Sequence, residues 1–249
     1  PLKYYTNNLF SLTNLLNELK NLNKEINFIF SSSATVYGDP KILPITESEP
    51  IKKAESPYGN TKQIGEEIIK DLVNSSSNFN AISLRYFNPI GAHPSALIGE
   101  LPIGIPQNLV PYITQTAIGK RNELTVFGDN YLTRDGSCIR DYIHVVDLAK
   151  AHIKSLEKLI KESSKNYYDA FNIGTGKGTS VLELISCFES VSGKKLNFRI
   201  GERRKGDIAK CFADVSKANE LLNWKSKHSI EDAILSSWNW EKHIKNEKL

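Results

Sequence analysis

The sequence predicts an α/β protein in which a doubly wound parallel sheet is joined to a smaller lobe of mixed α/β structure. Helical and strand patterns alternate over the first 90 residues, as they do in parallel sheets. A stretch rich in proline and glycine follows over 88–111, and the pattern beyond it is more irregular. With 249 residues, 40% of them hydrophobic and 24% charged, the chain can bury a substantial core.

The first half justifies the parallel sheet. Leucines at helical spacing predict a first helix, and the compact apolar run after it is typical of a buried parallel strand. A long loop with three prolines leads into a second helix and a second strand. These elements are expected, in order, at 8–22 (helix), 26–30 (strand), 31–56 (loop), 58–73 (helix) and 81–86 (strand). The chain opens on a helix and contains no methionine, so we expect the sheet to be incomplete at its N-terminus.

The second half predicts the mixed lobe. Most of 88–111 cannot form a regular element because of its prolines and glycines. Helices are expected at 146–160, 181–191, 216–222 and 230–244, and short strands at 170–173 and 196–200. We therefore assign 1–88 to the sheet domain and 89–249 mainly to the lobe, with about 130–175 returning to the sheet domain.

Charge and composition exclude several classes of function. The net charge of +4 is too small to indicate a nucleic-acid partner, and no apolar run is long enough to span a membrane. The first residues lack the apolar core of a signal peptide, so a cytoplasmic protein is expected. The three cysteines, Cys138, Cys187 and Cys211, have no metal-ligand spacing, which favours free thiols over a metal site or a disulfide framework.

A tyrosine and a lysine stand four positions apart at the start of the second helix, in Tyr58-Gly59-Asn60-Thr61-Lys62. This spacing places a phenol and an ammonium on one helix face. A nearby cation favours the charged form of an acid, so we expect Lys62, together with an oxidised nicotinamide ring, to lower the pKa of Tyr58. Tyr58 would then act as a base near neutral pH. By itself the pattern also fits a solvated helix face.

Polar side chains crowd the end of the preceding strand, in Ser31-Ser32-Ser33-Ala34-Thr35-Val36-Tyr37-Gly38. Open α/β sheets bind ligands at the carboxyl ends of their strands, although a structural serine turn would give the same pattern. The glycines at 174, 176 and 178 lack both the dinucleotide and the P-loop spacing, so we interpret them as a structural turn.

Several longer motifs carry a resemblance to a known family. Residues 30–38 and 56–62 resemble the extended short-chain dehydrogenase/reductase superfamily, and 85–94 and 140–149 resemble its UDP-glucose 4-epimerases in particular. The resemblance covers essentially the whole chain. It implies a Rossmann-like sheet domain, a UDP-sugar-binding lobe, a homodimer and tightly bound NAD, whose phosphate-binding glycine loop would lie in a segment before residue 1.

The resemblance also assigns roles to residues of the sheet domain. It implies Tyr58 as catalytic base, Lys62 as the residue that binds the nicotinamide ribose and tunes Tyr58, and Ser33 as a hydrogen-bond partner of the reacting C4 oxygen. The remaining expected cofactor contacts are Asn7, Asn8 and Phe87, and the expected sugar contacts beside Ser33 are Ala34 and Thr35. For either asparagine, a helix N-cap is an equally good interpretation.

For the nucleotide sugar, the resemblance points to a set of polar and apolar residues in the lobe. They are Asn88, Asn108, Leu109, Phe127, Arg140, Arg204, Asp207 and Cys211. Arginines suit a diphosphate because a guanidinium can engage it with two parallel hydrogen bonds. Where the family often has tyrosine at position 211, cysteine would leave room for an N-acetyl group. Gln107 replaces a frequent asparagine, which puts that contact in doubt.

The expected reaction is reversible C4 epimerisation of UDP-glucose and UDP-galactose in galactose metabolism, extended to UDP-GlcNAc and UDP-GalNAc. A 4,6-dehydratase is the nearest rival, but such enzymes carry an Asp-Glu pair where this chain has Ala34-Thr35. A non-catalytic binding protein or an inert fragment is the alternative of another class. The sequence leaves open the activity of these residues alone, the preferred UDP-sugar, the oligomeric state and any further catalytic domain.

Overall fold

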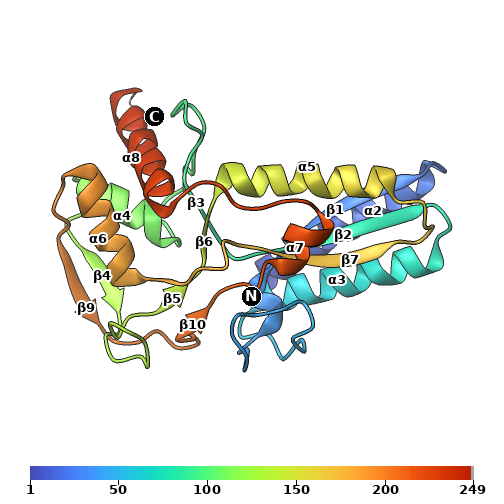
Figure 1. The fold of residues 1–249 in the computed structure, drawn as a ribbon, viewed down its shortest axis with the longest axis horizontal. Coiled ribbons are helices and arrows are strands. Elements are labelled where there is room, and N and C mark those ends of the chain that lie inside the picture. The colour runs from blue at the N-terminus through green and yellow to red at the C-terminus, as the bar shows by residue number, and fades with distance from the viewer. Residues whose placement is uncertain (248–249) are drawn as a thin grey trace. The chain divides into compact units, whose positions relative to one another are not determined.

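The computed structural model describes residues 1–247, which fall into two compact units (Figure 1). The first unit comprises Pro1–Phe87, Lys150–Ile173 and Ala213–Lys225, and the second unit comprises Asn88–Ala149, Gly174–Phe212 and the described residues from Ser226 onward. The chain was expected to return to the sheet domain over about 130–175. It returns over the shorter segment Lys150–Ile173 and then a second time over Ala213–Lys225. That second return is held by Lys217, whose ammonium donates to Asp169 at 2.5 Å and to the carbonyl oxygen of Ala170 at 2.9 Å.

The first unit contains a parallel sheet, which confirms the predicted α/β class. Its strands are β1 (Ile26–Ser33), β2 (Phe79–Tyr86) and β7 (Tyr168–Ile173), in the order β1-β2-β7. Strand β1 runs three residues beyond the predicted 26–30, because Ser31 to Ser33 continue the ladder and Ser33 pairs with Tyr86. The serines therefore lie at the carboxyl end of the sheet.

The helices of the first unit begin with an almost continuous segment made of α1 (Leu2–Tyr5), a π-helical turn (Thr6–Phe10) and α2 (Ser11–Asn21). The first unit also contains a 3₁₀ helix (Ala34–Tyr37), α3 (Pro57–Ser75), α7 (Ser216–Leu221) and most of α5 (Val145–Lys161). Helices α2 and α3 share a core with β2, formed by Leu12, Leu16, Ile69, Val73, Phe79 and Ala81. This core fixes α3, which carries the Tyr-x-x-x-Lys pattern, against the sheet.

The second unit is built from short strands, three helices and the start of a fourth helix. Strands β3 (Asn88–Ile90) and β6 (Tyr142–His144) form one parallel pair, and β4 (Leu124–Phe127) and β9 (Phe198–Gly201) form another. A third sheet has the order β10 (Lys210–Cys211), β5 (Ile139–Arg140), β8 (Thr179–Ser180). The helices are α4 (Leu109–Ala117), α6 (Val181–Ser192), α8 (Ile230–Glu247) and α5 (Val145–Lys161), in which the chain passes from the second unit to the first.

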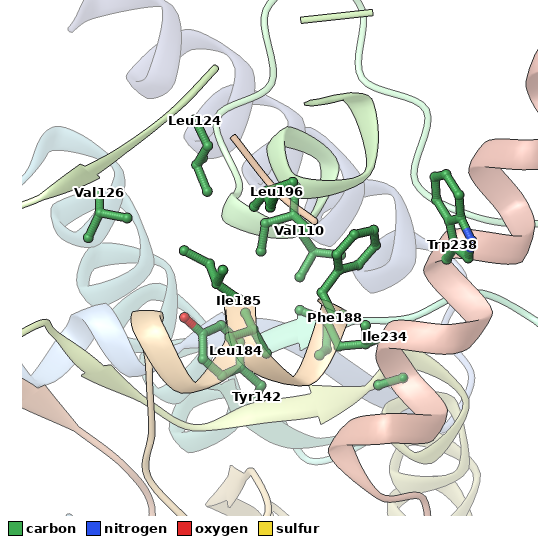
Figure 2. Close-up of a cluster of buried hydrophobic side chains, with 13 residues drawn as sticks. Val110, Leu124, Val126, Tyr142, Leu184, Ile185, Phe188, Leu196, Ile234 and Trp238 are labelled. Carbon is green, nitrogen blue, oxygen red and sulfur yellow. The ribbon is translucent and has the colours of Figure 1, made fainter. Parts of the chain in front are cut away.

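A hydrophobic core of 13 buried residues lies in the second unit (Figure 2). Leu184, Ile185 and Phe188 of α6 pack against Ile234 and Trp238 of α8. The rings of Phe188 and Trp238 meet edge to face with centroids 5.6 Å apart. The same cluster includes Val110 of α4 and Leu124 and Val126 of β4, so it supports the elements that surround the pocket described below.

No helix within residues 1–247 combines the length and the apolar character that a membrane crossing requires.

Candidate active site

Ser33 and Tyr58 form the centre of the candidate site in the first unit. Ser33 is the last residue of β1, is 8% exposed and caps the 3₁₀ helix by accepting a hydrogen bond from the Thr35 N–H at 3.3 Å. Tyr58 lies in the first turn of α3, which begins at Pro57 after the cap residue Ser56. The hydroxyl of Ser33 lies close enough to that of Tyr58 to lower its pKa as a hydrogen-bond donor. The serine at a strand end and the tyrosine at a helix start are thus brought together.

Burial raises the pKa of Tyr58 above its ordinary value. The hydrogen bond from Ser33 acts in the opposite direction, and the phenol of Tyr4, whose ring meets that of Tyr58 edge to face at 6.0 Å, adds a small upward effect. The expected lowering depends on Lys62 together with an oxidised nicotinamide ring, whereas in the chain alone the pKa of Tyr58 responds to burial, Ser33 and Tyr4. The desolvation of a half-buried phenol outweighs the polar contacts on the chain itself.

Lys62 lies one helical turn beyond Tyr58. Its ammonium is 5.5 Å from the centre of the Tyr58 ring and 5.1 Å from that of Phe30, and it donates to the carbonyl oxygen of Ser31 at 2.8 Å. Burial lowers the pKa of Lys62. An ammonium has three N–H donors, so this one bond leaves Lys62 with donors for a ligand.

Asn8 is tied to the same helix turn. Its side-chain amide donates to the hydroxyl of Thr61 at 2.9 Å, and Thr61 in turn donates to the carbonyl oxygen of Tyr58 at 2.7 Å. The N-cap interpretation of Asn7 and Asn8 is wrong, because both lie inside the π-helical turn 6–10 with helix on either side. Such turns are frequent at functional sites. Asn7 is exposed, and its carbonyl oxygen accepts a hydrogen bond from Ser11.

The remaining predicted residues of the first unit lie at the carboxyl ends of the strands. Ala34 is buried and Thr35 is exposed, and both belong to the 3₁₀ helix that follows Ser33. Phe87 directly follows β2, is 6% exposed and donates its N–H to the carbonyl oxygen of Ile173 at 3.1 Å. Of these three residues, only Thr35 is exposed at this edge.

The second unit contains a pocket of about 820 Å³. Seven of the eight residues that the resemblance assigned to the nucleotide sugar line it: Asn88, Asn108, Leu109, Phe127, Arg140, Arg204 and Asp207. Positions that are more than 100 residues apart in the sequence thus meet in one cavity. A volume of this size is ordinary for a small-molecule site.

Two arginines in the pocket share one carboxylate. The guanidinium of Arg204 donates to both oxygens of Asp207, at 2.9 and 3.2 Å, and lies 4.8 Å from the centre of the Phe127 ring. Arg140 is 3.9 Å from Asp207 and is held by the carbonyl oxygens of Ile139 and Ile208 at 2.9 and 2.8 Å. Asn108 donates to Glu100 at 2.7 Å. The pocket therefore combines two cations with an exposed aromatic face.

Several pocket residues were missed by the sequence reasoning. Tyr112 and Arg121 both line the cavity, with the guanidinium of Arg121 4.5 Å from the centre of the Tyr112 ring and bonded to Gln115 at 2.8 Å. Gln107, whose contact was in doubt, also lines the pocket. A tyrosine on a helix and an arginine in a turn have no spacing that marks them as partners.

Cys211 is the one residue of the eight assigned to the nucleotide sugar that does not line the pocket. It is 9% exposed and pairs in the β5–β10 ladder with Arg140, which does line the pocket. Burial raises the pKa of the Cys211 thiol to about 11. The thiol is therefore protonated at neutral pH, and its effect on a ligand would be one of size.

The glycine-rich turn 174–178 is structural, as predicted. The N–H groups of Thr175 and Gly176 donate to the buried carboxylate of Asp141 at 2.8 and 3.0 Å, so a protein carboxylate occupies the position that a phosphate would take in a nucleotide loop. In the part of the chain that the structure describes, no three His, Cys, Asp or Glu side chains gather as metal ligands.

Comparisons with known proteins agree with these motifs. Residues 1–236 match the family model described as GDP-mannose 4,6 dehydratase. The chain is 48% identical over 246 residues to UDP-glucose 4-epimerase of Drosophila melanogaster, a match that covers 99% of this chain and 70% of that protein.

Solved structures give the same result. The UDP-glucose 4-epimerase of Stenotrophomonas maltophila, crystallised with NAD and formylated UDP-arabinopyranose, superposes with a TM-score of 0.94 at 44% identity, covering 99% of this chain and 72% of that one. The enzyme of Bifidobacterium longum, in complex with NAD⁺ and UDP, gives a TM-score of 0.92 at 47% identity with the same coverage. The chain therefore belongs to the UDP-glucose 4-epimerase family of the short-chain dehydrogenase/reductase superfamily.

Proposed function

We propose that this protein catalyses the reversible C4 epimerisation of UDP-glucose and UDP-galactose, with NAD as its resident cofactor. The observation that carries the proposal is the proximity of three groups: the hydroxyl of Ser33 acts on that of Tyr58, and the ammonium of Lys62 lies 5.5 Å from the centre of the Tyr58 ring. A phenol linked to a hydroxyl can pass a proton between them, and an ammonium nearby favours the phenolate. Lys62 and Tyr58 are therefore suited to removing the proton of a sugar hydroxyl.

The residues of the first unit fit a nicotinamide cofactor. Lys62 keeps donors for ribose hydroxyls, and the buried Phe87 directly follows β2 at the carboxyl end of the sheet. When bound, NAD⁺ supplies a reversible hydride acceptor and a positive charge. That charge favours the ionised form of Tyr58, whose pKa burial raises in the chain alone. The NAD-bound relatives support the same cofactor here.

Proton transfer is the part of the reaction that this chain performs. Tyr58, directly or through Ser33, takes the proton from the C4 hydroxyl as C4 is oxidised and returns it when the ketone is reduced. Ser33 donates to the C4 oxygen and keeps it oriented, and Thr35 is a further hydroxyl for the sugar. Because the same proton and hydride return, no net oxidation results.

The pocket of the second unit is proposed to hold the UDP part of the substrate. Arg140 and Arg204 supply the positive charge that a diphosphate requires, and Phe127 supplies a ring for stacking. With UDP anchored, the 4-keto sugar can turn about its link to the phosphate without leaving the protein. Asn88, Asn108, Leu109 and Asp207 complete the proposed contacts.

Dehydration is the rival reaction, since the matching family model bears the description of a 4,6-dehydratase. Elimination needs an acid and a base beside the sugar. The positions after Ser33 hold Ala34 and Thr35, whose side chains cannot supply a carboxyl group. This favours epimerisation.

We further propose that UDP-GlcNAc and UDP-GalNAc are substrates, because a cysteine at 211 takes less space than a tyrosine. Galactose metabolism is the pathway in which such a reaction would serve, and a homodimer is the expected assembly. Light scattering of the purified enzyme tests the assembly.

The function is tested by incubating the complete enzyme with UDP-galactose and no external reductant. We expect UDP-glucose to form, and Tyr58→Phe to lower turnover by about 10²- to 10⁴-fold, the range of general acid–base contributions. Tyr5→Phe is the matched control, since the Tyr5 phenol accepts a bond from Asn60 at 3.0 Å and has no proposed chemical role. Binding of UDP-galactose without conversion would instead support a non-catalytic binding protein.

A further inference from the structure

Five buried polar side chains lie behind the candidate site of the first unit, and the proposed mechanism does not use them. They are Ser32 of β1, Tyr37 of the 3₁₀ helix, Glu66 of α3, Arg85 of β2 and Asn172 of β7, each no more than 6% exposed. Together they are called the buried network below. Each comes from a different element, so the network joins all three strands to the two helical segments of the site.

The centre of the buried network is a two-pronged ion pair. The Nε of Arg85 donates to Glu66 Oε1 at 3.0 Å, and Nη2 donates to Oε2 at 2.6 Å. The hydroxyl of Ser32 donates to Glu66 Oε1 at 2.5 Å. This fixes the last residues of β1 to the helix that carries Tyr58 and Lys62.

The second arm of the buried network runs through Tyr37. Arg85 Nη1 donates to the Tyr37 oxygen at 2.9 Å, and the Tyr37 hydroxyl donates to Asn172 Oδ1 at 2.7 Å. Asn172 Nδ2 then donates to the carbonyl oxygen of Ile45 at 2.8 Å. Burial raises the pKa of Tyr37 to about 12, so its hydroxyl keeps the proton that this bond needs.

Three members of the buried network lie next to residues that are proposed to act in catalysis. Ser32 directly precedes Ser33, and Tyr37 ends the 3₁₀ helix that Ser33 caps. Glu66 lies four residues, one helical turn, beyond Lys62. A shift in any of these anchors therefore moves Ser33 or the first turns of α3.

A buried ion pair is a poor way to gain stability, because desolvation of both charges offsets their attraction, and apolar side chains of the same volume often do as well. Hydrogen bonds differ from apolar contacts in that they fix direction and distance. A fully connected polar cluster at this place is therefore better explained by a need to fix the positions of the neighbouring side chains than by a need for stability.

We propose that the buried network positions Ser33 against Tyr58 for proton transfer, so that its members are positioning residues of the epimerase reaction. The inference rests on the proposed function. It predicts a loss that appears in turnover and in the titration of Tyr58, while substrate binding is kept because the UDP pocket residues belong to the second unit.

The test uses Tyr37→Phe and Ser32→Ala in the complete enzyme. Tyr37→Phe preserves shape and the Arg85–Glu66 pair, and Ser32→Ala removes one hydroxyl, so both variants are expected to fold. We expect each to lower kcat by about tenfold or more, since small misplacements of reacting groups are costly, with KM for UDP-galactose unchanged. Ser32→Thr, which restores a hydroxyl, should recover kcat.

A second readout does not depend on turnover. Phenolate absorbance during a pH titration, taken as the difference between each protein and its Tyr58→Phe counterpart, reports the ionisation of Tyr58. Ser33 is the group that lowers the Tyr58 pKa, while burial and Tyr4 raise it and Lys62 lies 5.5 Å from the ring. Weaker contact with Ser33 should therefore move the titration to higher pH in both variants.

Asn80→Ala is the matched control. Asn80 is 3% exposed on β2 and bonds to Asn27 at 3.4 Å and to the N–H of Tyr167 at 2.9 Å, at the amino ends of the strands. It should lower the melting temperature at least as much as Ser32→Ala and leave kcat and the Tyr58 titration unchanged. If the network variants do not differ from Asn80→Ala, or keep wild-type kcat and titration, the network is structural and the inference is wrong. If wild-type protein itself fails to epimerise, the proposed function has failed instead.

Discussion

The backbone of Gly59 lies so close to Thr35 that a Cβ at position 59 would come within 3.1 Å of the Thr35 carbonyl oxygen and 3.3 Å of its Cβ. This close approach brings the first turn of α3 against the segment that follows Ser33. This close approach is a steric reason for glycine at position 59, next to the proposed catalytic residue Tyr58.

Gly59→Ala should reduce turnover more than stability. Alanine favours a helix over glycine by up to about 1 kcal/mol, whereas overpacking costs about 1–3 kcal/mol, so the net loss of unfolding free energy is small. The added methyl group should push Tyr58 away from Ser33 and lower kcat. Thermal unfolding and steady-state assays measure the two effects. Turnover equal to wild type would show that the approach does not position Tyr58.

Ser33→Ala should shift the pH dependence of kcat/KM. The proposed reaction needs ionised Tyr58, so its rate should rise with pH up to the pKa of that residue. Ser33 lowers this pKa against the effects of burial and Tyr4. Its removal should therefore move the acid limb to higher pH, in addition to lowering the maximum. An acid limb in the same place in both proteins would mean that another group controls it.

Arg204→Ala should weaken UDP binding by about tenfold or more, because a charge-assisted hydrogen bond contributes about 1.5–3 kcal/mol. Arg204→Lys keeps the charge but loses the two-pronged geometry, so it should restore only part of the affinity. Titration calorimetry with UDP gives both values. Arg203→Ala is the control: Arg203 stacks on Tyr131, bonds to Asn130 and does not line the pocket. Equal losses for the two arginines would contradict the assignment.

Cys211→Tyr should abolish conversion of UDP-GlcNAc and preserve that of UDP-galactose. The larger side chain would fill space beside Arg140, the strand partner of Cys211. Initial rates with both substrates test this, with thermal unfolding as a check that the buried site accepts the ring. If a folded variant lost both activities to the same extent, the size of residue 211 would not explain the choice between the two substrates.

Asp147→Ala should destabilise the fold by about 2 kcal/mol or more, because it leaves buried donors without an acceptor. The buried Asp147 carboxylate accepts from the N–H groups of Lys227 and His228 at 2.7 and 2.8 Å and contacts His228 Nδ1 at 2.9 Å. Burial raises its pKa, but these bonds outweigh burial and lower it overall.

The same carboxylate gives stability a pH dependence. A pKa lowered by folding adds stability above the unfolded value near 3.9, and this is lost as the pH falls through the lower folded value. The stability difference between wild type and Asp147→Ala should therefore shrink below about pH 4. Denaturant melts at pH 7 and pH 3 test it, and a difference that stays constant would assign the effect to packing.

The sequence predicted the long elements well, because their signals are local. Helix α3 was expected at 58–73 and spans Pro57–Ser75, and α6 was expected at 181–191 and spans Val181–Ser192. Helix α4 and strand β4 were not predicted. They occupy nine and four residues, and their position depends on the shared core with α6 and α8 rather than on a periodic pattern.

The candidate site was predictable to the extent that its residues belong to recognisable motifs. Tyr58, Ser33 and seven pocket residues were found in this way. The buried network was not, because Glu66 and Asn172 are unremarkable in sequence and gain meaning only when strands and helix meet. The upward effect of burial on the pKa of Tyr58 was missed. Sequence spacing indicates which charged residues are near Tyr58, but it does not indicate how strongly folding desolvates the phenol.

The chain passes between its two compact units five times, after residues 87, 149, 173, 212 and 225. Neither unit can therefore be excised or expressed as a continuous stretch of gene. Grafting the second unit of one family member onto the first unit of another would need five junctions, one of them inside helix α5. Exchange of substrate preference between such enzymes is consequently expected to proceed by point substitution rather than by shuffling of domains.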